Sequence, residues 1–236
     1  MPGARGVAVV IPTFNEAESI GAVVAELKRH VVDRIIVADG GSNDDTHQAA
    51  RRAGAELPEV GRGYGRACLA GAQAAHDADI VVFMDGDGAD DPAAIAAMVA
   101  AIRSGSYDFV IGSRARGKRE AGSMAGHQLL VGRAAGALIA LLYGVRYTDM
   151  GALRAIRRDT LLALGMRELT YGWNLEMQMR VARAGLRVLE LPVAYRRRSG
   201  GESKVAGSLR GSLRAGLRII TTFARVALEP ARGRRY

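Results

Sequence analysis

Two aspartates that follow one apolar segment are the residues of this sequence with the clearest chemical potential. Asp85 and Asp87 come directly after the apolar run 81–84, in the segment Met-Asp-Gly-Asp-Gly. If that run is a β-strand, alternate side chains share one face, so both carboxylates converge at its end. Mg²⁺ and Mn²⁺ prefer oxygen ligands and commonly lie between a carboxylate and substrate phosphates. We therefore expect a divalent metal at Asp85 and Asp87; the alternative is a simple turn of Asp and Gly.

Two further segments carry carboxylates just after apolar runs. Asp39 follows the run 34–38 and precedes two glycines. A carboxylate there can accept hydrogen bonds from a base or ribose, and glycine lets the backbone approach a ligand. A capping turn explains Asp39 equally well. The segment Pro-Thr-Phe-Asn-Glu of residues 12–16 adds a rigid turn, an aromatic ring and the carboxylate of Glu16. The helix dipole explains Glu16 equally well, because it favours an acidic residue in the first turn of a helix.

The glycine-rich segment 61–65, Gly-Arg-Gly-Tyr-Gly, matches a dinucleotide fingerprint only in part. The G-x-G-x-x-G spacing fails at Arg66 and Cys68, and the segment does not follow the first strand of the chain. We therefore exclude a dinucleotide cofactor here and expect a loop in which a diphosphate approaches the backbone at Gly63.

Basic side chains that could bind phosphate cluster in two places. Arg114 follows the apolar run 109–111, and three arginines at 196–198 precede Lys204. Arginine binds phosphate through two parallel hydrogen bonds, so we expect phosphate ligands in both places. For any single arginine, a solvated charge run is the commoner explanation. The glycines at 200–201 indicate a loop that closes over a substrate.

The elements that must position these side chains alternate along the first half of the chain. The sequence predicts strands at 7–11, 34–38, 80–84 and 109–111, with helices at 16–29, 44–53, 66–76 and 92–104. Strand alternating with helix predicts a parallel sheet with both faces covered, and ligands bind at the carboxyl ends of such strands. In the second half we expect helices at 127–143, 172–184 and 203–228, and extended segments at 147–155 and 188–196.

The last expected helix is amphipathic and basic. Its apolar side combines Leu209, Leu213, Leu217, Ile220, Phe223, Val226 and Leu228, beside Arg210, Arg214 and Arg218. Such a helix suits an anionic bilayer surface, although packing against the rest of the chain explains it at least as well. We divide the chain into a catalytic domain, residues 1–204, and a basic helix, residues 205–236, that contacts a membrane surface.

Composition limits the class of protein. Cys68 is the only cysteine among 236 residues, which excludes an intramolecular disulfide and cysteine-based metal clusters and suits a cytoplasmic protein. The apolar run near the N-terminus is too short for a signal peptide or a membrane span. The net charge of +9 permits a non-catalytic protein that binds membranes or nucleic acid. However, aromatic residues make up only 5% of the chain, so we expect no nucleic-acid partner.

Taken in order, these motifs resemble the family 2 glycosyltransferases with a GT-A fold, most closely the polyprenyl-phosphate (dolichyl-phosphate) mannose and glucose synthases. The similar segments are 9–16, 36–42, 84–88, 111–114, 148–155 and 200–204. The resemblance implies an α/β fold of the GT-A type, with a Rossmann-like, mostly parallel sheet, helices on both faces and a C-terminal amphipathic helix. It also implies a metal-dependent, inverting transfer of hexose from GDP-mannose or UDP-glucose to a polyprenyl phosphate at the inner membrane face. A soluble or other lipid acceptor is the alternative, and a homo-oligomer is left open.

The resemblance also assigns roles to particular residues. The nucleotide sugar would be bound by Pro12, Phe14, Glu16, Asp39, Gly63, Asp85, Gly86 and Asp87, and Mg²⁺ or Mn²⁺ by Asp85 and Asp87. The catalytic residues would be Asp87, Arg114, Arg196 and Lys204, of which the three basic ones hold the acceptor phosphate. That phosphate is already an anion, so positioning and charge neutralisation of the leaving group suffice without a strong base. Ala89 stands where the family often has a glutamine, which leaves the third metal ligand open.

Overall fold

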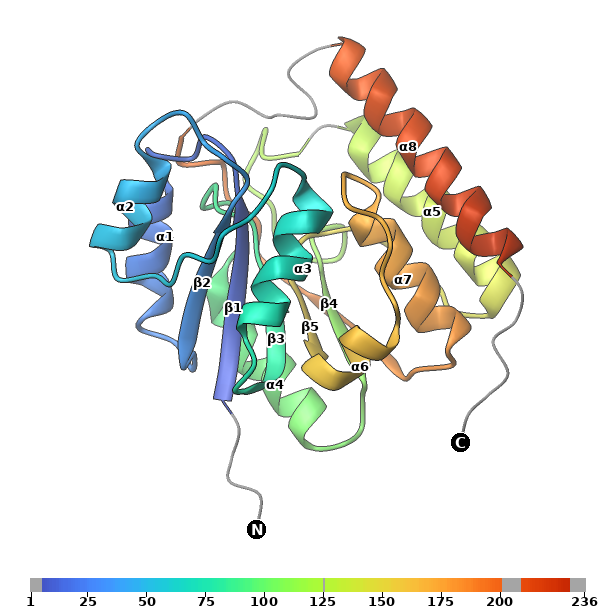
Figure 1. The fold of residues 1–236 in the computed structure, drawn as a ribbon. Helices are drawn as coiled ribbons and strands as arrows, with labels where there is room; N and C mark the ends of the chain where they lie inside the picture. Colours follow the sequence, from blue (N-terminus) through green and yellow to red (C-terminus); the bar gives the residue numbers. More distant parts are fainter. Residues whose placement is uncertain (1–5, 125, 201–208, 230–236) are drawn as a thin grey trace.

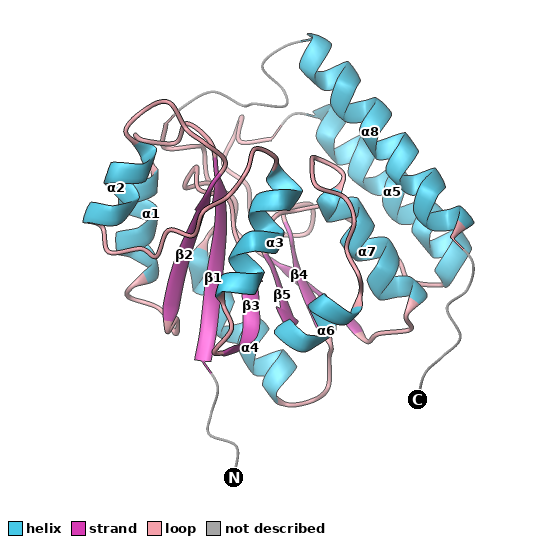
Figure 2. Cartoon of the chain, in the orientation of Figure 1, coloured by secondary structure: helices cyan, strands magenta, loops and turns pink. Residues whose placement is uncertain are grey.

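The first four strands of a six-stranded central sheet form from short runs that contain valine and isoleucine, which favour extended backbone. The computed structural model describes residues 6–124, 126–200 and 209–229. The strands are β1 (Gly6–Thr13), β2 (Arg34–Asp39), β3 (Ala78–Phe83), β4 (Phe109–Ser113), β5 (Arg154–Arg157) and β6 (Val188–Pro192). They lie in the order β2-β1-β3-β5-β4-β6, and β5 alone runs antiparallel to its neighbours. Figure 2 shows these strands at the centre of the molecule.

Helices cover both faces of the sheet because alternate side chains of each buried strand point to opposite faces. In β1, Val7 and Val9 pack on one face, whereas Ala8 and Val10 pack on the other. The first face is covered by α1 (Ile20–Leu27), α2 (Thr46–Arg52) and α4 (Ile95–Arg103), and the second by α3 (Tyr64–Ala74), α6 (Arg158–Ala163) and α7 (Trp173–Arg183) (Figure 1). The helices α5 (Gly126–Tyr143) and α8 (Leu209–Leu228) pack on α7, and the 3₁₀ turn η1 (Pro92–Ala94) precedes α4.

The predicted alternation of strand and helix is confirmed in the first half of the chain, although the helix ends differ by up to four residues. Of the segment 147–155, for which a strand or an extended piece was expected, only residues 154 and 155 belong to a strand. Thr148 donates its backbone N–H to Glu190 and Gln178 donates to the carbonyl of Asp149, so this segment bonds to β6 and α7 and enters the sheet only at Arg154. The helix α6 has no counterpart in the prediction because six residues give no clear periodic signal.

The carboxyl ends of β1, β2, β3 and β4 lie at one edge of the sheet, because these strands run in the same direction. Hydrogen bonds join the segments that follow them. The N–H of Gly40 donates to the carbonyl of Thr13 over 2.8 Å, and the Ser19 hydroxyl donates to the carbonyl of Gly86 over 2.8 Å. The polar segments that follow the strands therefore lie together at the edge where ligands were expected to bind.

The apolar side expected on the last helix divides into a buried part and an exposed part. Phe223 and Val226 pack into the core, whereas Leu217, Ile220 and Leu228 are exposed. The side chains of residues 209–215 and the domain boundary after residue 204 lie outside the described part of the chain. In the described residues, no helix combines the length and apolar character needed to cross a membrane.

A buried carboxylate anchors α8 to the rest of the molecule. The Glu176 side chain is fully buried in α7, and its Oε1 accepts hydrogen bonds from Arg180 Nε at 2.9 Å and from Arg225 Nη1 at 3.0 Å. Its Oε2 accepts two backbone N–H groups, those of Arg167 and Glu168. One carboxylate therefore joins α7, α8 and the loop before α7.

Replacing this carboxylate should be costly. We expect Glu176→Ala to lower the free energy of unfolding by about 3 kcal/mol, because it removes the acceptor of two backbone N–H groups and one carboxylate partner of the buried Arg180. Asp108→Ala is the matched control: it also removes an Arg–carboxylate pair, but Arg187 is exposed, so the loss should be much smaller. Urea unfolding of both variants measures the difference, and equal losses would contradict the anchoring role.

Candidate active site

Three carboxylates converge in the turn that follows β3. Asp87 is 7% exposed and Asp90 is 2% exposed, while Asp85 is partly buried. The backbone N–H of Asp85 donates to Asp90 Oδ2 over 3.2 Å, and the N–H of Ala89 donates to Asp87 Oδ1 over 3.0 Å. The backbone of the turn thus holds the carboxylates of Asp87 and Asp90. Of these two, Asp90 was not placed in the site by the sequence analysis.

The crowded negative charge changes the acidity of these groups. Burial, and then the charges of Asp87 and Asp90, raise the pKa of Asp85 to about 8. Burial also raises the pKa of Asp90 to about 6, against the opposing effect of Arg114. A cation among these oxygens would relieve the repulsion, so the donor set fits a divalent metal.

Two carboxylates leave most of a metal's coordination to other donors. Among the residues that the structure describes, no three His, Cys, Asp or Glu side chains are grouped to form a complete metal cage. Mg²⁺ is usually bound in this way, through one or two carboxylates together with water and substrate phosphates.

The residues predicted to bind a nucleotide lie at the ends of β1 and β2. Asp39 accepts hydrogen bonds from the N–H and the hydroxyl of Ser42, which makes the turn after β2 rigid. Phe14 lies under the Arg62 guanidinium, whose carbon is 4.7 Å from the ring centroid. The loop before α3 also lies close to the end of β2, because a Cβ added to Gly40 would be 3.9 Å from the backbone nitrogen of Gly63.

The predicted glycine of this loop is required by the backbone. Gly63 has a φ of +133°, and a Cβ there would lie 2.5 Å from the carbonyl oxygen of Leu169. The next residue, Tyr64, donates its hydroxyl to Asp85 Oδ1 over 3.3 Å. The loop therefore connects the nucleotide side of the site to the carboxylates, through a tyrosine that sequence reasoning did not select.

Arg114 is held in one orientation by three hydrogen bonds to Asp149. Its Nε and Nη2 each donate over 2.8 Å and its backbone N–H donates over 2.9 Å. Burial alone would raise the pKa of Asp149, but the hydrogen bonds and the charge of Arg114 outweigh it and hold the pKa below its usual value. The guanidinium carbon lies 4.9 Å from the Tyr195 ring centroid. The partner of Arg114 lies within the segment 148–155 noted in the sequence, but no local signal there identified Asp149.

Arg196 and Arg198 of the arginine cluster bind different carboxylates. Arg196 donates to Glu26 over 3.0 Å and to Asp91 over 3.0 Å, on the α1 side of the site. Arg198 instead lies among the predicted ligands: its Nη2 donates to Glu16 Oε1 over 3.0 Å and its Nε is 3.5 Å from Asp87 Oδ2. Lys204 lies outside the described residues.

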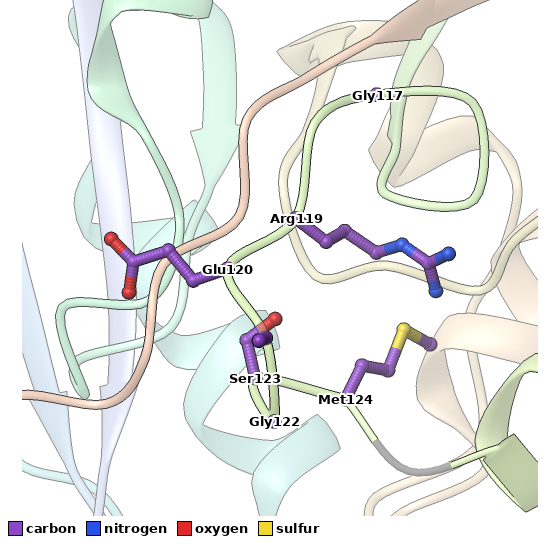
Figure 3. A pocket seen from close by; sticks show the side chains of 7 residues that line it. Gly117, Arg119, Glu120, Gly122, Ser123 and Met124 are labelled. Carbon is purple, nitrogen blue, oxygen red and sulfur yellow. The ribbon is translucent and has the colours of Figure 1, made fainter.

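A cavity of about 330 Å³ opens beside the Tyr195 segment. It is lined by Gly117, Arg119, Glu120, Ala121, Gly122, Ser123 and Met124. Figure 3 shows Arg119 and Met124 reaching into the same space, whereas Glu120 points away from it. The N–H of Tyr195 donates to the carbonyl of Lys118 and the N–H of Glu120 donates to the carbonyl of Tyr195, both over 2.9 Å. This loop was not among the predicted site residues, because its glycines indicate only a turn.

Known proteins share both the sequence pattern and the fold. The model of the family described as glycosyl transferase family 2 matches residues 8–165. An uncharacterized glycosyltransferase of Mycobacterium tuberculosis is 39% identical to this chain, over 88% of the chain and 93% of the relative. The undecaprenyl-phosphate mannosyltransferase of Micrococcus luteus is 32% identical, over 87% of the chain and 89% of the relative.

Among solved structures, glucosyl-3-phosphoglycerate synthase from Mycobacterium tuberculosis is similar in fold. Its complex with phosphoglyceric acid gives a TM-score of 0.74 at 24% identity, covering 97% of this chain and 82% of the other. Its complex with Mn²⁺, UDP-glucose and phosphoglyceric acid gives a TM-score of 0.72 at 22% identity, with the same coverage. The expected GT-A fold is thereby confirmed.

The raised pKa of Asp85 predicts how the stability of the metal-free protein depends on pH. A carboxyl whose pKa is about 8 when folded and about 4 when unfolded holds a proton in the folded state that the unfolded state has lost. The free energy of unfolding should therefore fall as the pH rises from about 6 to about 8. Melting temperatures measured across this range should show a smaller decline in Asp85→Asn, whose amide does not titrate. An identical decline in both proteins would contradict the prediction.

Proposed function

Because this chain belongs to glycosyl transferase family 2, we propose that it transfers a hexose from a nucleotide sugar to a polyprenyl phosphate. The protein is a glycosyltransferase; the proposal concerns its metal, donor and acceptor. The observation that carries the proposal is the juxtaposition of the carboxylates Asp85 and Asp87 with the guanidinium groups of Arg114 and Arg198 at one edge of the sheet. Such a site can hold a metal–diphosphate on one side and an anionic acceptor on the other.

The donor would lie across the ends of β1, β2 and β3. We assign the base and ribose to Pro12, Phe14, Glu16 and Asp39, and the diphosphate to the backbone at Gly63 and Gly86. Asp85 and Asp87 would hold Mg²⁺ or Mn²⁺, which when bound supplies positive charge to the leaving nucleoside diphosphate. Tyr64 would keep Asp85 in place through its 3.3 Å hydrogen bond.

The acceptor would enter on the side of Arg114. An oxygen of the acceptor phosphate attacks the anomeric carbon while the bond from that carbon to the nucleoside diphosphate breaks, so the configuration inverts. Asp149 and Tyr195 hold the Arg114 guanidinium in position before the acceptor arrives, which favours binding of an anion without reorganisation. Arg196 would fix the 195–199 loop through Glu26 and Asp91, and Lys204 would complete the phosphate site.

A lipid acceptor requires contact with a bilayer, and two helices offer a suitable surface. The exposed apolar side chains are Leu130, Val131, Leu138, Leu141 and Leu142 on α5, and Leu217, Ile220 and Leu228 on α8. Exposed arginines accompany them, Arg133 on α5 and Arg218 on α8. We propose that these helices rest on the anionic inner face of the cell membrane, with the leucines among the lipid chains.

Transfer assays with GDP-mannose and UDP-glucose, each offered undecaprenyl phosphate or 3-phosphoglycerate, test the proposal. We expect transfer from one donor to undecaprenyl phosphate, and its loss in EDTA. Asp87→Ala should reduce the rate about a hundredfold or more, because the charge of the leaving group is no longer neutralised. Asp77→Ala, which removes an exposed aspartate at the opposite end of β3, should retain the wild-type rate. Transfer to 3-phosphoglycerate alone would show that the acceptor is not a polyprenyl phosphate. Transfer that continues in EDTA would contradict the proposed metal.

Co-sedimentation with vesicles of phosphatidylglycerol tests the membrane surface. Leu141→Glu on α5 and Leu228→Glu on α8 change side chains that are 81% and 82% exposed, so the fold should be kept. We expect each to weaken vesicle binding about tenfold, because a charge replaces a side chain that enters the lipid. Leu162→Glu on α6 is the control, since Leu162 is an exposed leucine outside the proposed surface. Equal loss in all three variants would contradict the orientation.

A further inference from the structure

We propose that Arg198 is an internal counterion of the carboxylate site. In the free protein its guanidinium supplies positive charge at Asp87 and Glu16, and a divalent cation competes with it for that place. The inference rests on the metal site of the proposed function and adds a residue that controls when this site is open. It predicts that binding of the metal releases Arg198 from the carboxylates.

The contacts of Arg198 are those of a partly satisfied ion pair. Nη2 donates to Glu16 Oε1 at 3.0 Å, whereas Nε is buried, lies 3.5 Å from Asp87 Oδ2 and has no hydrogen-bond partner. A guanidinium that leaves a buried N–H unsatisfied forfeits part of the stabilisation of a two-point contact. Its separation from Asp87 therefore breaks no hydrogen bond, and a divalent cation can supply the positive charge that Asp87 would lose.

The other arginine of the site shows what a permanent pair looks like. Arg114 makes three hydrogen bonds of 2.8–2.9 Å to Asp149, two of them from the guanidinium. Arg114 is therefore committed to its own carboxylate. Arg198, in contrast, is a cation that meets two carboxylates from different loops and is fully bonded to neither.

Hydrogen bonds hold the backbone on both sides of Arg198, whereas its side chain donates one hydrogen bond, from Nη2 to Glu16. The N–H of Ser199 donates to the carbonyl of Asp87 over 2.9 Å, and the N–H of Arg196 donates to the carbonyl of Ala89 over 2.8 Å. These bonds tie the loop to the metal-binding turn on both sides of Arg198. The Arg198 side chain remains 28% exposed, so it has an open path to solvent. A rotation of this side chain frees the carboxylates without movement of the loop.

Release of Arg198 would change the charge offered to the acceptor. Bound to Glu16 and Asp87, the guanidinium is neutralised; once displaced, it is an unpaired cation at the mouth of the same site. The acceptor phosphate would therefore meet one more positive charge after the metal and donor have bound than before. The competition thus favours binding of the donor before the acceptor.

Titration of Mn²⁺ into the protein without nucleotide, followed by the EPR signal of free Mn²⁺, tests the competition directly. Arg198→Ala and Arg198→Gln should bind Mn²⁺ about three- to tenfold more tightly than wild type, because the competing charge is gone. Arg198→Lys keeps the charge and should stay near wild type. Arg197→Ala is the matched control: it removes the same charge from the same loop, but Arg197 Nε donates to the carbonyl of Ala121 instead.

A second readout does not depend on the affinity of the metal alone. Without metal, Arg198→Ala should melt at a lower temperature than Arg197→Ala, since the carboxylates lose their counterion, and Mn²⁺ should raise its melting temperature more than that of wild type. Unchanged or weaker Mn²⁺ binding in folded Arg198→Ala and Arg198→Gln would overturn the proposal while leaving the metal site intact. Failure of wild type to bind Mn²⁺, with UDP or GDP present, would overturn the metal site and this proposal together.

Discussion

Mutual repulsion of buried carboxylates at the end of β3 is the constraint around which the surrounding loops are arranged. Asp87 and Asp90 are almost fully buried, and Glu16 is 8% exposed beside them. Burial and the neighbouring negative charges raise the pKa of Asp85 and Asp90, so the fold must bring positive charge to this turn. Arg114 and Arg198 do so from two separate segments, one held permanently by Asp149 and the other shared between two carboxylates. The 113–124 and 195–199 loops thus each contribute one of these two arginines.

The part of the site that is local in sequence could be predicted. Asp39, Asp85 and Asp87 each follow an apolar run, and the parallel direction of those runs brings their ends together. The partners of the arginines could not be predicted, because Arg196 and Arg198 differ only in which distant carboxylates they meet. Arg196 pairs with Glu26 and Arg198 with Glu16, at separations of 170 and 182 residues. No local pattern carries that information.

The orientation of the C-terminal helix also could not be predicted from local sequence. Its amphipathic pattern predicted an apolar side but not how that side would be shared between core and surface. The structure buries Val226 and leaves Leu228 82% exposed, because Arg225 and Arg180 meet at Glu176 and fix the rotation of α8 on α7. Charge pairing beneath the helix thus determines which of its leucines are left facing outward.

The separation between Arg198 and Glu16 has a consequence for the order in which the protein folds. Contacts between residues 182 positions apart form only after most of the chain is available, and such non-local contacts slow folding. A chain that emerges from the ribosome N-terminus first would gather the carboxylates of β1 and β3 long before the 195–199 loop exists. Until β6 has paired with β4, the nascent sheet carries its acidic edge without Arg198, the second of its two arginines.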